Sequence, residues 1–378
     1  MSNGMEYCVW SKRGWTLQEL VCSRRMIVFQ ESKVLFLCAK AQWDEDICLE
    51  EWIIDSPSYE GHKTQPLLRM LDDWSRLPLP YEQRRHMLQG LASLLEQYTS
   101  RTLSYDDDIL NAFAGVGEIL EPYLGRPHWG VPASGFYMFL QFENWSSQLV
   151  KRRKGYPSWS WRGWHLPKGD KIYIDGAAEA LLDFHLLHRD SKLMLVLDGR
   201  SMSSSEEQYD QRHPHFEGRV GREDIISLPL TAYHFSARSH LPFVAFYTSC
   251  AVFRISDAPE RYSRDTGRWF DLRHPSSGKK LKTVARTTTY KESGEVYKDY
   301  EIERITRSAL TLNEDWSKDR PRDQEFIVIA YGNHEKSWSR LMLIEWTDGI
   351  AYRVPVTATV SAVDWWTFKP MRKLIVLG

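Results

Sequence analysis

Residues 10–20 have the sequence Trp10-Ser11-Lys12-Arg13-Gly14-Trp15-Thr16-Leu17-Gln18-Glu19-Leu20, which combines aromatic, basic and acidic side chains more densely than any other segment. Thr16 and Glu19 have the spacing of a capping box, in which a Thr hydroxyl and a Glu carboxylate satisfy backbone N–H groups at the start of a helix. The spacing therefore predicts a short helix that begins near Thr16, with Glu19 in a structural role.

This segment resembles a motif of a known family. Residues 13–19, followed by Ser23-Arg24-Arg25 and an apolar run to Phe29, resemble the third and last motif of the fungal heterokaryon incompatibility (HET) domain. Two later segments, residues 104–115 and 157–164, resemble sequences that commonly follow this domain in fungal proteins. The resemblance implies a role in fungal self/non-self recognition and programmed cell death. The motif residues are Trp10, Arg13, Gly14, Trp15, Thr16, Leu17, Gln18 and Glu19.

The chain departs from the family at its start. HET domains usually open with Tyr-x-x-Leu-Ser-Tyr-x-Trp-Gly and continue through Trp-Ile-Asp-x-x-Cys-Ile-Asn-Gln, and neither motif occurs in this sequence. We therefore expect residues 1–50 to be a short C-terminal remnant of a TIR-like HET domain. A gene model that begins late and a natural truncation are both compatible with this pattern.

A catalytic role for Glu19 is the alternative. HET domains remotely resemble the Toll/interleukin-receptor (TIR) fold, and the spacing from Trp15 to Glu19 resembles the segment with the catalytic glutamate of TIR-type NAD glycohydrolases. By this resemblance, Glu19 would stabilise an oxocarbenium-like centre as nicotinamide leaves, much as a carboxylate acts in glycoside hydrolases. A TIR-like parallel sheet needs several βα units before this helix, with the nucleotide at their carboxyl ends. The sequence supplies no such units, so we expect a protein without catalytic activity.

Composition narrows the possible partners. The 378 residues include 49 Lys and Arg against 50 Asp and Glu, which gives no electrostatic reason to expect nucleic acid or an anionic membrane. The start of the chain shows no signal sequence and no apolar run is long enough to span a bilayer, so a cytoplasmic protein is expected. The 16 Trp, 18 Tyr and 15 Phe indicate either aromatic cores or a broad surface for protein partners. A purely structural protein-interaction module is thus a third hypothesis.

Signatures of catalysis and metal binding are missing from the sequence. It contains no Gly-x-Ser-x-Gly, no phosphate-binding Gly-x-x-x-x-Gly-Lys-Ser/Thr and no His-Glu-x-x-His. Asp106-Asp107-Asp108 is interpreted as complementing a helix dipole rather than as a metal site. No cofactor and no metal are expected, and NAD enters only as the substrate of the alternative. Five cysteines and two pairs of histidines remain as possible metal ligands, but the cysteines lack the spacing of a metal site and the histidine pairs lack further ligands nearby in the sequence. They are Cys8, Cys22, Cys38, Cys48, Cys250 and the pairs His185/His188 and His213/His215.

The apolar pattern predicts an α+β protein. Residues 26–29 and 34–38 form a hairpin pattern within the HET remnant. Residues 51–165 are predicted to be a helical region, with helices at 67–74, at 81–98 and from Ser104, which begins a capping box with Asp107, to Pro122. This region ends in a Trp-rich segment with the cluster Trp159, Trp161 and Trp164. In residues 158–162 Trp residues alternate with polar ones, which predicts a strand with one buried face.

Just before the Trp-rich segment lies the basic run Lys151-Arg152-Arg153-Lys154. Such a run can hold a phosphate backbone or form a solvated loop, and the neutral net charge favours the loop.

Residues 166–378 are predicted to be a β-rich C-terminal domain. Short β-prone runs occur at residues 172–174, 193–197, 243–255, 296–305, 326–331, 341–346, 350–354 and 374–377. Two of these runs flank Thr347-Asp348-Gly349, and an Asp-Gly pair in this position predicts a tight hairpin.

Overall fold

The computed structural model is an α+β structure with two compact units, Met1–Gly135 with Lys168–Gly176, and Phe136–Pro167 with Ala177–Gly378. It describes residues 9–29, 34–38, 42–44, 47–49, 81–144, 150–166, 171–174, 178–179, 182–187, 193–198, 242–257, 268–280, 286–287, 303–304, 310–312, 322–332 and 338–378. The helix predicted at residues 67–74 lies outside these residues.

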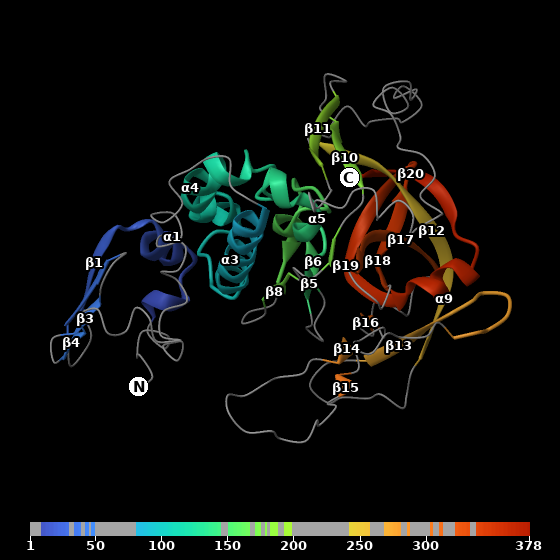
Figure 1. Cartoon of the computed structure of the whole chain (residues 1–378), viewed down its shortest axis with the longest axis horizontal. Helices are drawn as coiled ribbons and strands as arrows, with labels where there is room; N and C mark the ends of the chain where they lie inside the picture. The colour runs from blue at the N-terminus through green and yellow to red at the C-terminus, as the bar shows by residue number, and fades with distance from the viewer. Residues whose placement is uncertain are drawn as a thin grey trace. The chain divides into compact units, whose positions relative to one another are not determined.

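The first unit contains three α-helices among its described residues, α1 (Gly14–Cys22), α3 (Tyr81–Thr99) and α4 (Ala114–Leu124) (Figure 1). Short 3-10 turns occur at η2 (Trp10–Lys12), η3 (Asp106–Ile109), η4 (Asn111–Phe113) and η5 (Ala133–Gly135). The strands are β1 (Arg25–Phe29), β2 (Val34–Cys38), β3 (Gln42–Asp44), β4 (Ile47–Leu49) and β8 (Ile172–Tyr173). The run at 172–174, assigned from sequence to the β-rich domain, thus belongs to the first unit.

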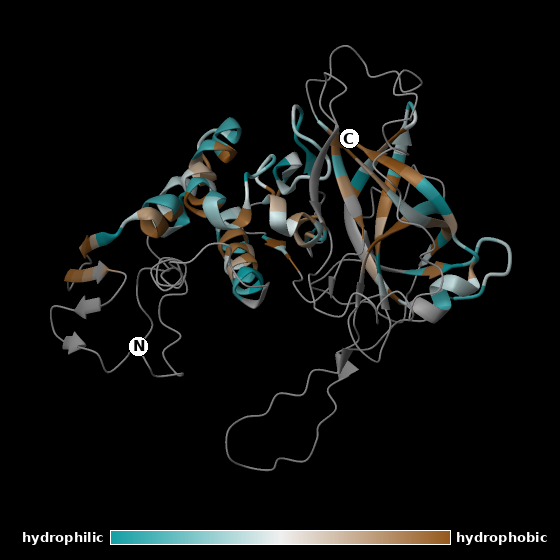
Figure 2. Ribbon diagram, turned by 45° about the horizontal axis from the view of Figure 1, so that its top comes forward, coloured by the Kyte–Doolittle hydropathy of each residue, from teal (hydrophilic) through white to brown (hydrophobic). Residues whose placement is uncertain are grey.

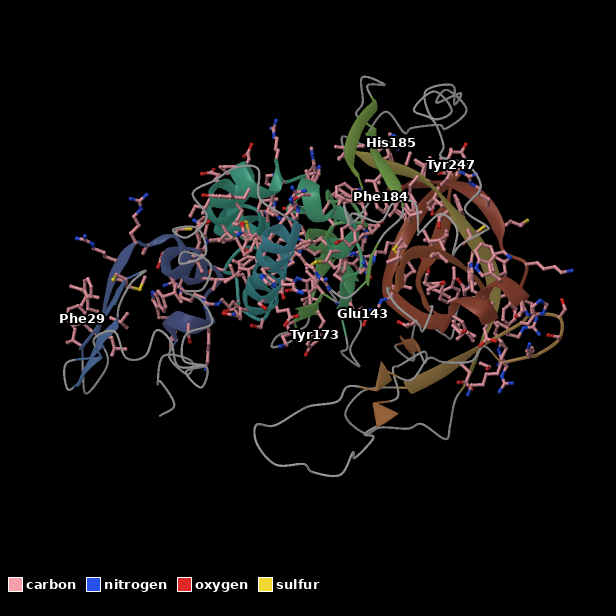
Figure 3. All side chains as sticks on the ribbon, viewed as in Figure 1. Phe29, Glu143, Tyr173, Phe184, His185 and Tyr247 are labelled. Atoms are coloured by element: carbon pink, nitrogen blue, oxygen red, sulfur yellow. The ribbon has the colours of Figure 1, made fainter. Side chains whose placement is uncertain are left out.

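The four strands β1 to β4 form an antiparallel sheet in sequence order. Met26 pairs with Leu37 and Phe29 with Val34, so the predicted hairpin is confirmed. Phe29 lies at the end of β1, and its side chain is 78% exposed (Figure 3).

Helix α3 confirms the helix predicted at residues 81–98. Its apolar residues at helical spacing are all buried: Met87, Leu88, Leu91, Leu94, Leu95 and Tyr98. They join buried side chains of α1 and α4, namely Leu17, Val21, Val116, Leu120 and Leu124. Side chains that recur every three or four residues fall on one face of a helix, and burying that face stabilises the first unit.

The capping box predicted at Thr16 is wrong. Helix α1 begins at Gly14 with Arg13 as its N-cap, and no side chain caps it. The Gly14 N–H group donates instead to the carbonyl of Thr102, at 2.8 Å. The Thr16 hydroxyl donates to the carbonyls of Trp10 (2.5 Å) and Arg13 (2.7 Å). A backbone carbonyl from another segment thus satisfies one of the N–H groups at the helix start that have no partner within the helix.

The helix predicted from Ser104 to Pro122 is wrong in its first half. Residues 106–113 form the turns η3 and η4, and the N-cap of η3 is Tyr105, without a side-chain cap. The Tyr98 hydroxyl donates to the carbonyl of Ile109 (3.1 Å), an oxygen that a continuous α-helix would use for its own backbone. At the other end α4 continues through Pro122 to Leu124, and Gly125 follows at a φ of 74°.

In the second unit, five strands form a closed ring in which each strand pairs with the next. In order they are β12 (Phe243–Asp257), β20 (Met371–Leu377), β19 (Ile350–Ser361), β18 (Trp338–Thr347) and β17 (Asp323–Gly332). Pairing of β17 with β12 closes the ring. Outside the ring, β10 (Asp183–Leu187) pairs with β12 and β11 (Leu193–Asp198), and β9 (Ala178–Glu179) pairs with β17. β13 (Arg268–Arg273) joins β12 to β16 (Leu310–Leu312). Closing a sheet pairs the edges that would otherwise be open.

Shorter elements complete the described part of this unit. They are α5 (Phe136–Phe139), β5 (Glu143–Asn144), β6 (Lys151–Arg152), η6 (Trp161–Gly163), β7 (Trp164–His165), the pair β14 (Arg286–Thr287) and β15 (Glu303–Arg304), and α9 (Ala362–Thr367).

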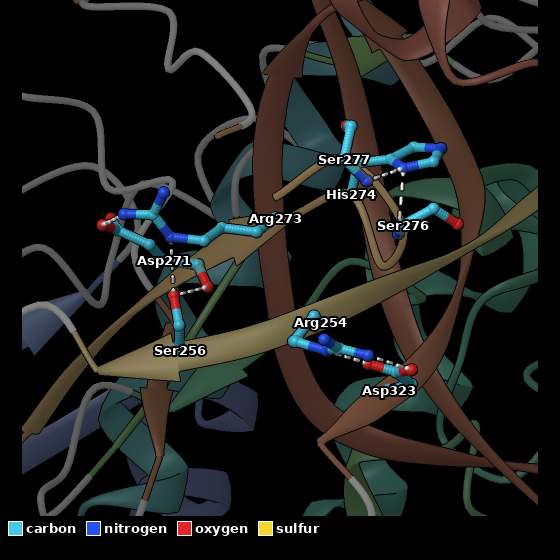
Figure 4. Close-up of polar contacts among 8 residues, drawn as sticks. All are labelled: Arg254, Ser256, Asp271, Arg273, His274, Ser276, Ser277 and Asp323. Atoms are coloured by element: carbon cyan, nitrogen blue, oxygen red, sulfur yellow. Dashed lines mark hydrogen bonds and ion pairs between the residues drawn. The ribbon is translucent and has the colours of Figure 1, made fainter. Parts of the chain in front are cut away.

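Alternate side chains of the ring strands form one apolar core together with Leu272 of β13 and Trp365 of α9. Its buried members are Phe253, Ile255, Leu272, Phe326, Val328, Leu341, Leu343, Val354, Ala358, Val360 and Trp365. Apolar and polar stretches follow one another along these strands (Figure 2). Trp365 comes from α9, and its indole N–H donates to the hydroxyl of Ser249 on β12 (3.1 Å). At the surface, Arg254 of β12 and Asp323 of β17 form a bidentate ion pair, at 2.7 and 3.0 Å (Figure 4).

The Asp-Gly hairpin is confirmed. Thr347 pairs with Ile350 across the turn, and Asp348 (φ 51°) and Gly349 (φ 78°) both have the positive φ of a type I′ turn. The strand predicted for the Trp-rich segment is wrong, because residues 158–163 form turns and the 3-10 helix η6. This segment, assigned from sequence to the end of the helical region, belongs to the second unit. Of the run predicted at 296–305, only residues 303–304 are described.

Candidate functional site

The HET-like motif forms a compact joint in the first unit. Its first turn is tied to the segment that follows α3. The Thr102 N–H group donates to the carbonyl of Lys12 (2.8 Å), in addition to the bond from Gly14 to Thr102. The Arg101 guanidinium donates to the Thr16 hydroxyl, at 3.0 Å, and to the carbonyl of Arg13, at 3.3 Å. These contacts fix the entry to α1.

Gly14 lies close to a leucine where the two segments meet. A Cβ atom at this position would lie 2.4 Å from Cδ2 of Leu103, so the end of that side chain would have to shift. The absence of a side chain at Gly14 therefore lets Leu103 pack directly against the backbone that pairs with Thr102.

Helix α1 is joined to the second HET-like segment by two polar contacts. The Trp15 indole N–H donates to a carboxylate oxygen of Asp108, at 3.2 Å. The Gln18 side-chain oxygen accepts from the backbone N–H of Gly115, at 2.8 Å. Two segments whose sequences each resemble those of HET proteins, residues 10–20 and 104–115, thus pack against each other. Asp108 was interpreted from sequence as a helix-dipole residue, and nothing in the sequence indicates its partner Trp15.

Glu19 lies on the exposed side of α1. Within the described part of the chain it has neither a hydrogen bond nor an ion pair, in contrast to Trp15, Thr16 and Gln18. A glycosidase-type mechanism uses two carboxylates that flank the reacting bond. No second carboxylate is seen in contact with Glu19 among the described residues. Its role in NAD cleavage stays a prediction.

The Trp-rich segment meets the ring where β19 and β20 separate. These two strands run parallel and pair only at Ala351 and Leu377. Ser158 lies beside this point: its N–H group donates to the carbonyl of Gly378 (2.8 Å), and its hydroxyl donates to the same oxygen. The Ser158 hydroxyl also accepts from the backbone N–H of Arg353, at 2.9 Å. One buried serine therefore connects the two diverging strands.

The three tryptophans of the cluster are buried. The Trp159 indole N–H donates to the carbonyl of Pro242 (3.4 Å), and that of Trp164 donates to the carbonyl of Ser158 (2.9 Å). Trp159 and Phe184 both pack against Phe136, with ring centroids 5.4 and 5.2 Å apart. For Trp159, Trp161 and Trp164, the structure thus favours an aromatic core over an exposed interaction face.

Arg353 of β19 places a positive charge in the interior of the second unit. Its side chain is 1% exposed, and its guanidinium donates to the carbonyls of Leu140 and Phe142 and lies 3.5 Å above the Phe142 ring. Burial lowers the pKa of Arg353 to about 9, and the nearby charge of Glu143 partly offsets this effect. Glu143 itself pairs with Arg340, at 3.0 Å. The Arg353 side chain stays protonated at neutral pH and anchors residues 140–142 to β19.

Neither a cluster of metal ligands nor a membrane-spanning helix is found among the described residues. Among them no group of three or more His, Cys, Asp or Glu side chains could hold a metal ion. His185 is buried within β10 (Figure 3), whereas His188, His213 and His215 fall outside the described residues. In the part of the chain that the structure describes, no helix is both long and apolar enough to cross a membrane.

Comparisons with known proteins add no relative. No protein-family model, curated protein or solved structure matches the chain. The resemblance to the HET family therefore rests on the motif residues of the sequence alone.

Proposed function

We propose that this chain is a HET-family protein of fungal self/non-self recognition, in which a C-terminal remnant of a TIR-like HET domain acts through protein contacts and without catalysis. One observation carries this proposal. Trp15 and Gln18 of the first HET-like segment bind Asp108 and Gly115 of the second. Segments that belong to one functional unit are expected to be in contact, and these two are separated by more than 80 residues of sequence.

The non-catalytic half of the proposal is supported by the side chain of Glu19. A carboxylate that stabilises a developing cation works best in a site that excludes water, where its charge is weakly screened. Glu19 is exposed on α1 and has no polar partner among the described residues. Its neighbours Thr16 and Gln18 instead point their polar atoms at backbone groups that hold the unit together.

Induced expression in a filamentous fungus tests the recognition role. The wild-type chain should cause growth arrest and uptake of a vital dye, as a cell-death reaction does. Gln18→Ala, which removes the contact to Gly115, should weaken this response, whereas Glu19→Gln should preserve it. Wild-type protein that accumulates in soluble form without any effect on growth would overturn the proposal.

Incubation of the purified protein with NAD separates the two halves of the proposal. We expect no release of nicotinamide from either the wild-type chain or Glu19→Gln. Release by the wild type that disappears in Glu19→Gln, at unchanged melting temperature, would assign the catalytic role to Glu19 and overturn the non-catalytic half.

A further inference from the structure

The antiparallel sheet of the first unit ends in an open edge. Its strand order is β1-β2-β3-β4, and among the described residues β1 pairs only with β2. Successive residues of a strand direct their backbone N–H and C=O groups to opposite sides, so part of the β1 backbone has no strand partner. The other edge strand, β4, has three residues, a length that limits further pairing. The five-residue strand β1 is therefore the edge that can accept another strand.

The outer face of β1 exposes large apolar side chains. Burial alternates along the strand, with Arg25, Ile27 and Phe29 exposed and Met26 and Val28 half-buried. Ile27 is 58% exposed and Phe29 is 78% exposed (Figure 3). The solvated face of an antiparallel sheet normally carries polar side chains instead. Water is therefore an unfavourable neighbour for this face.

Few of the features that protect an edge strand are present in β1. Edges are commonly blocked by lysine, proline or a β-bulge, since each of these prevents a further strand from pairing. Strand β1 contains no lysine and no proline, and its pairing with β2 runs without a register shift from residue 25 to residue 29. Arg25, at the start of the strand, is its one charged side chain. An apolar, regular edge of this kind is typical of a strand that pairs with another chain.

The order of side chains along β1 suits a second copy of the same strand. In an antiparallel pair centred on Ile27, this residue faces Ile27 of the second copy, and Arg25 of each copy faces Phe29 of the other. Apolar side chains then meet at the centre, and each guanidinium lies opposite an aromatic ring, which attracts it. The two Arg25 residues are four positions apart along the strands, roughly 14 Å, so their charges do not oppose each other. Parallel pairing in register would place Arg25 against Arg25, and like-charge repulsion disfavours it.

We propose that two copies of this chain associate through β1, which joins their sheets edge to edge about a twofold axis. A twofold interface uses the same surface on both chains, so one strand supplies both halves. Pairing gives the open backbone groups of both edges a partner and partly covers Ile27 and Phe29. Stable interfaces bury about 800 Å² on each partner, more than one five-residue strand provides, so the dimer should be weak and depend on concentration.

Self-association through β1 is independent of the proposed role in recognition, and its tests measure oligomeric state rather than cell death. The first test is sedimentation velocity of the full chain over a range of concentrations, with a reducing agent present. The wild type should shift from monomer toward dimer as its concentration rises. Ile27→Lys places two like charges directly opposite each other and should weaken association about tenfold or more. Val252→Lys, at a 47% exposed position on β12 of the second unit, is the matched control and should associate like the wild type.

Cysteine cross-linking tests the register of the two strands. Ile27→Cys places the new thiols of the two copies opposite each other, with Cβ atoms about 4.5–5.5 Å apart, so a small adjustment allows a disulfide. Phe29→Cys places them four positions apart, roughly 14 Å along the strands, which a disulfide cannot bridge. Mild oxidation should therefore give a covalent dimer of Ile27→Cys alone, above the background from the native cysteines of the wild type.

Three results would overturn the assignment. These are a wild type that stays monomeric at every concentration, equal association of Ile27→Lys and the wild type, and a covalent dimer of Phe29→Cys as abundant as that of Ile27→Cys. If Ile27→Lys fails to fold by circular dichroism, Ile27→Thr takes its place, because threonine keeps the β-branched shape and removes apolar area. Unchanged association in that folded variant also refutes the pairing.

Discussion

Replacing Ser158 with alanine should destabilise the second unit. The hydroxyl of Ser158 is the acceptor for the buried N–H of Arg353, at 2.9 Å, and alanine leaves that donor without this partner. The bond from the Ser158 N–H group to the carbonyl of Gly378 remains, so a single backbone donor is lost. A buried donor left unsatisfied costs about 2 kcal/mol, within a range of about 1 to 3.

The expected change is large enough to measure. For a unit of this size, about 2 kcal/mol corresponds to a fall of roughly 4–8 °C in melting temperature. Thermal unfolding followed by tryptophan fluorescence gives the shift, and hydrogen exchange at the Arg353 amide reports the local change. Ser276→Ala is the matched control, because this serine is exposed on the loop shown in Figure 4. A Ser158→Ala protein that melts like the wild type and still protects the Arg353 amide would refute the bridging role.

Three further predictions concern reactivity, packing and surface charge. Burial and a hydrogen bond to a neighbouring carboxylate raise the pKa of Cys250 to about 12, so iodoacetamide at pH 8 should label this thiol only after unfolding. Because that folded-state pKa lies above the unfolded one, stability should also fall as pH rises from about 9 towards 12, and Cys250→Ala should flatten this fall. Gly163→Ala should lower the free energy of unfolding more than Gly14→Ala does, by about 1 kcal/mol or more in denaturant titrations. The new Cβ at residue 163 meets a backbone carbonyl, whereas the new Cβ at residue 14 meets the end of a leucine side chain. Equal losses in the two variants would contradict this prediction. Asp323→Asn, which breaks the exposed ion pair with Arg254, should leave the melting temperature unchanged, since water and salt screen such pairs. A clear fall would show a larger structural role.

Local patterns predicted the elements whose structure depends on near neighbours. The inner face of α3 follows from apolar residues at helical spacing, and the hairpin at Asp348 and Gly349 follows from two residues that tolerate positive φ. The same reasoning failed at Thr16 and Ser104. There, contacts with distant segments decide the local structure: the helix starts at Gly14, whose N–H donates to the carbonyl of Thr102, and the Tyr98 hydroxyl donates to the carbonyl of Ile109, which a continuous helix would have used.

The sequence by itself determined the α+β class, the long helix α3, the hairpins and the segments that resemble the HET family. Only the tertiary structure decided that the first two HET-like segments form one joint, that Trp159 and Trp161 are core residues, and that Lys151 and Arg152 of the basic run pair with residues 164–165 as strands rather than form a loop. The physical reason is distance along the chain. Ser158 and Arg353 lie 195 residues apart, and Trp15 and Asp108 lie 93 apart, so their hydrogen bonds leave no trace in any local pattern of residues.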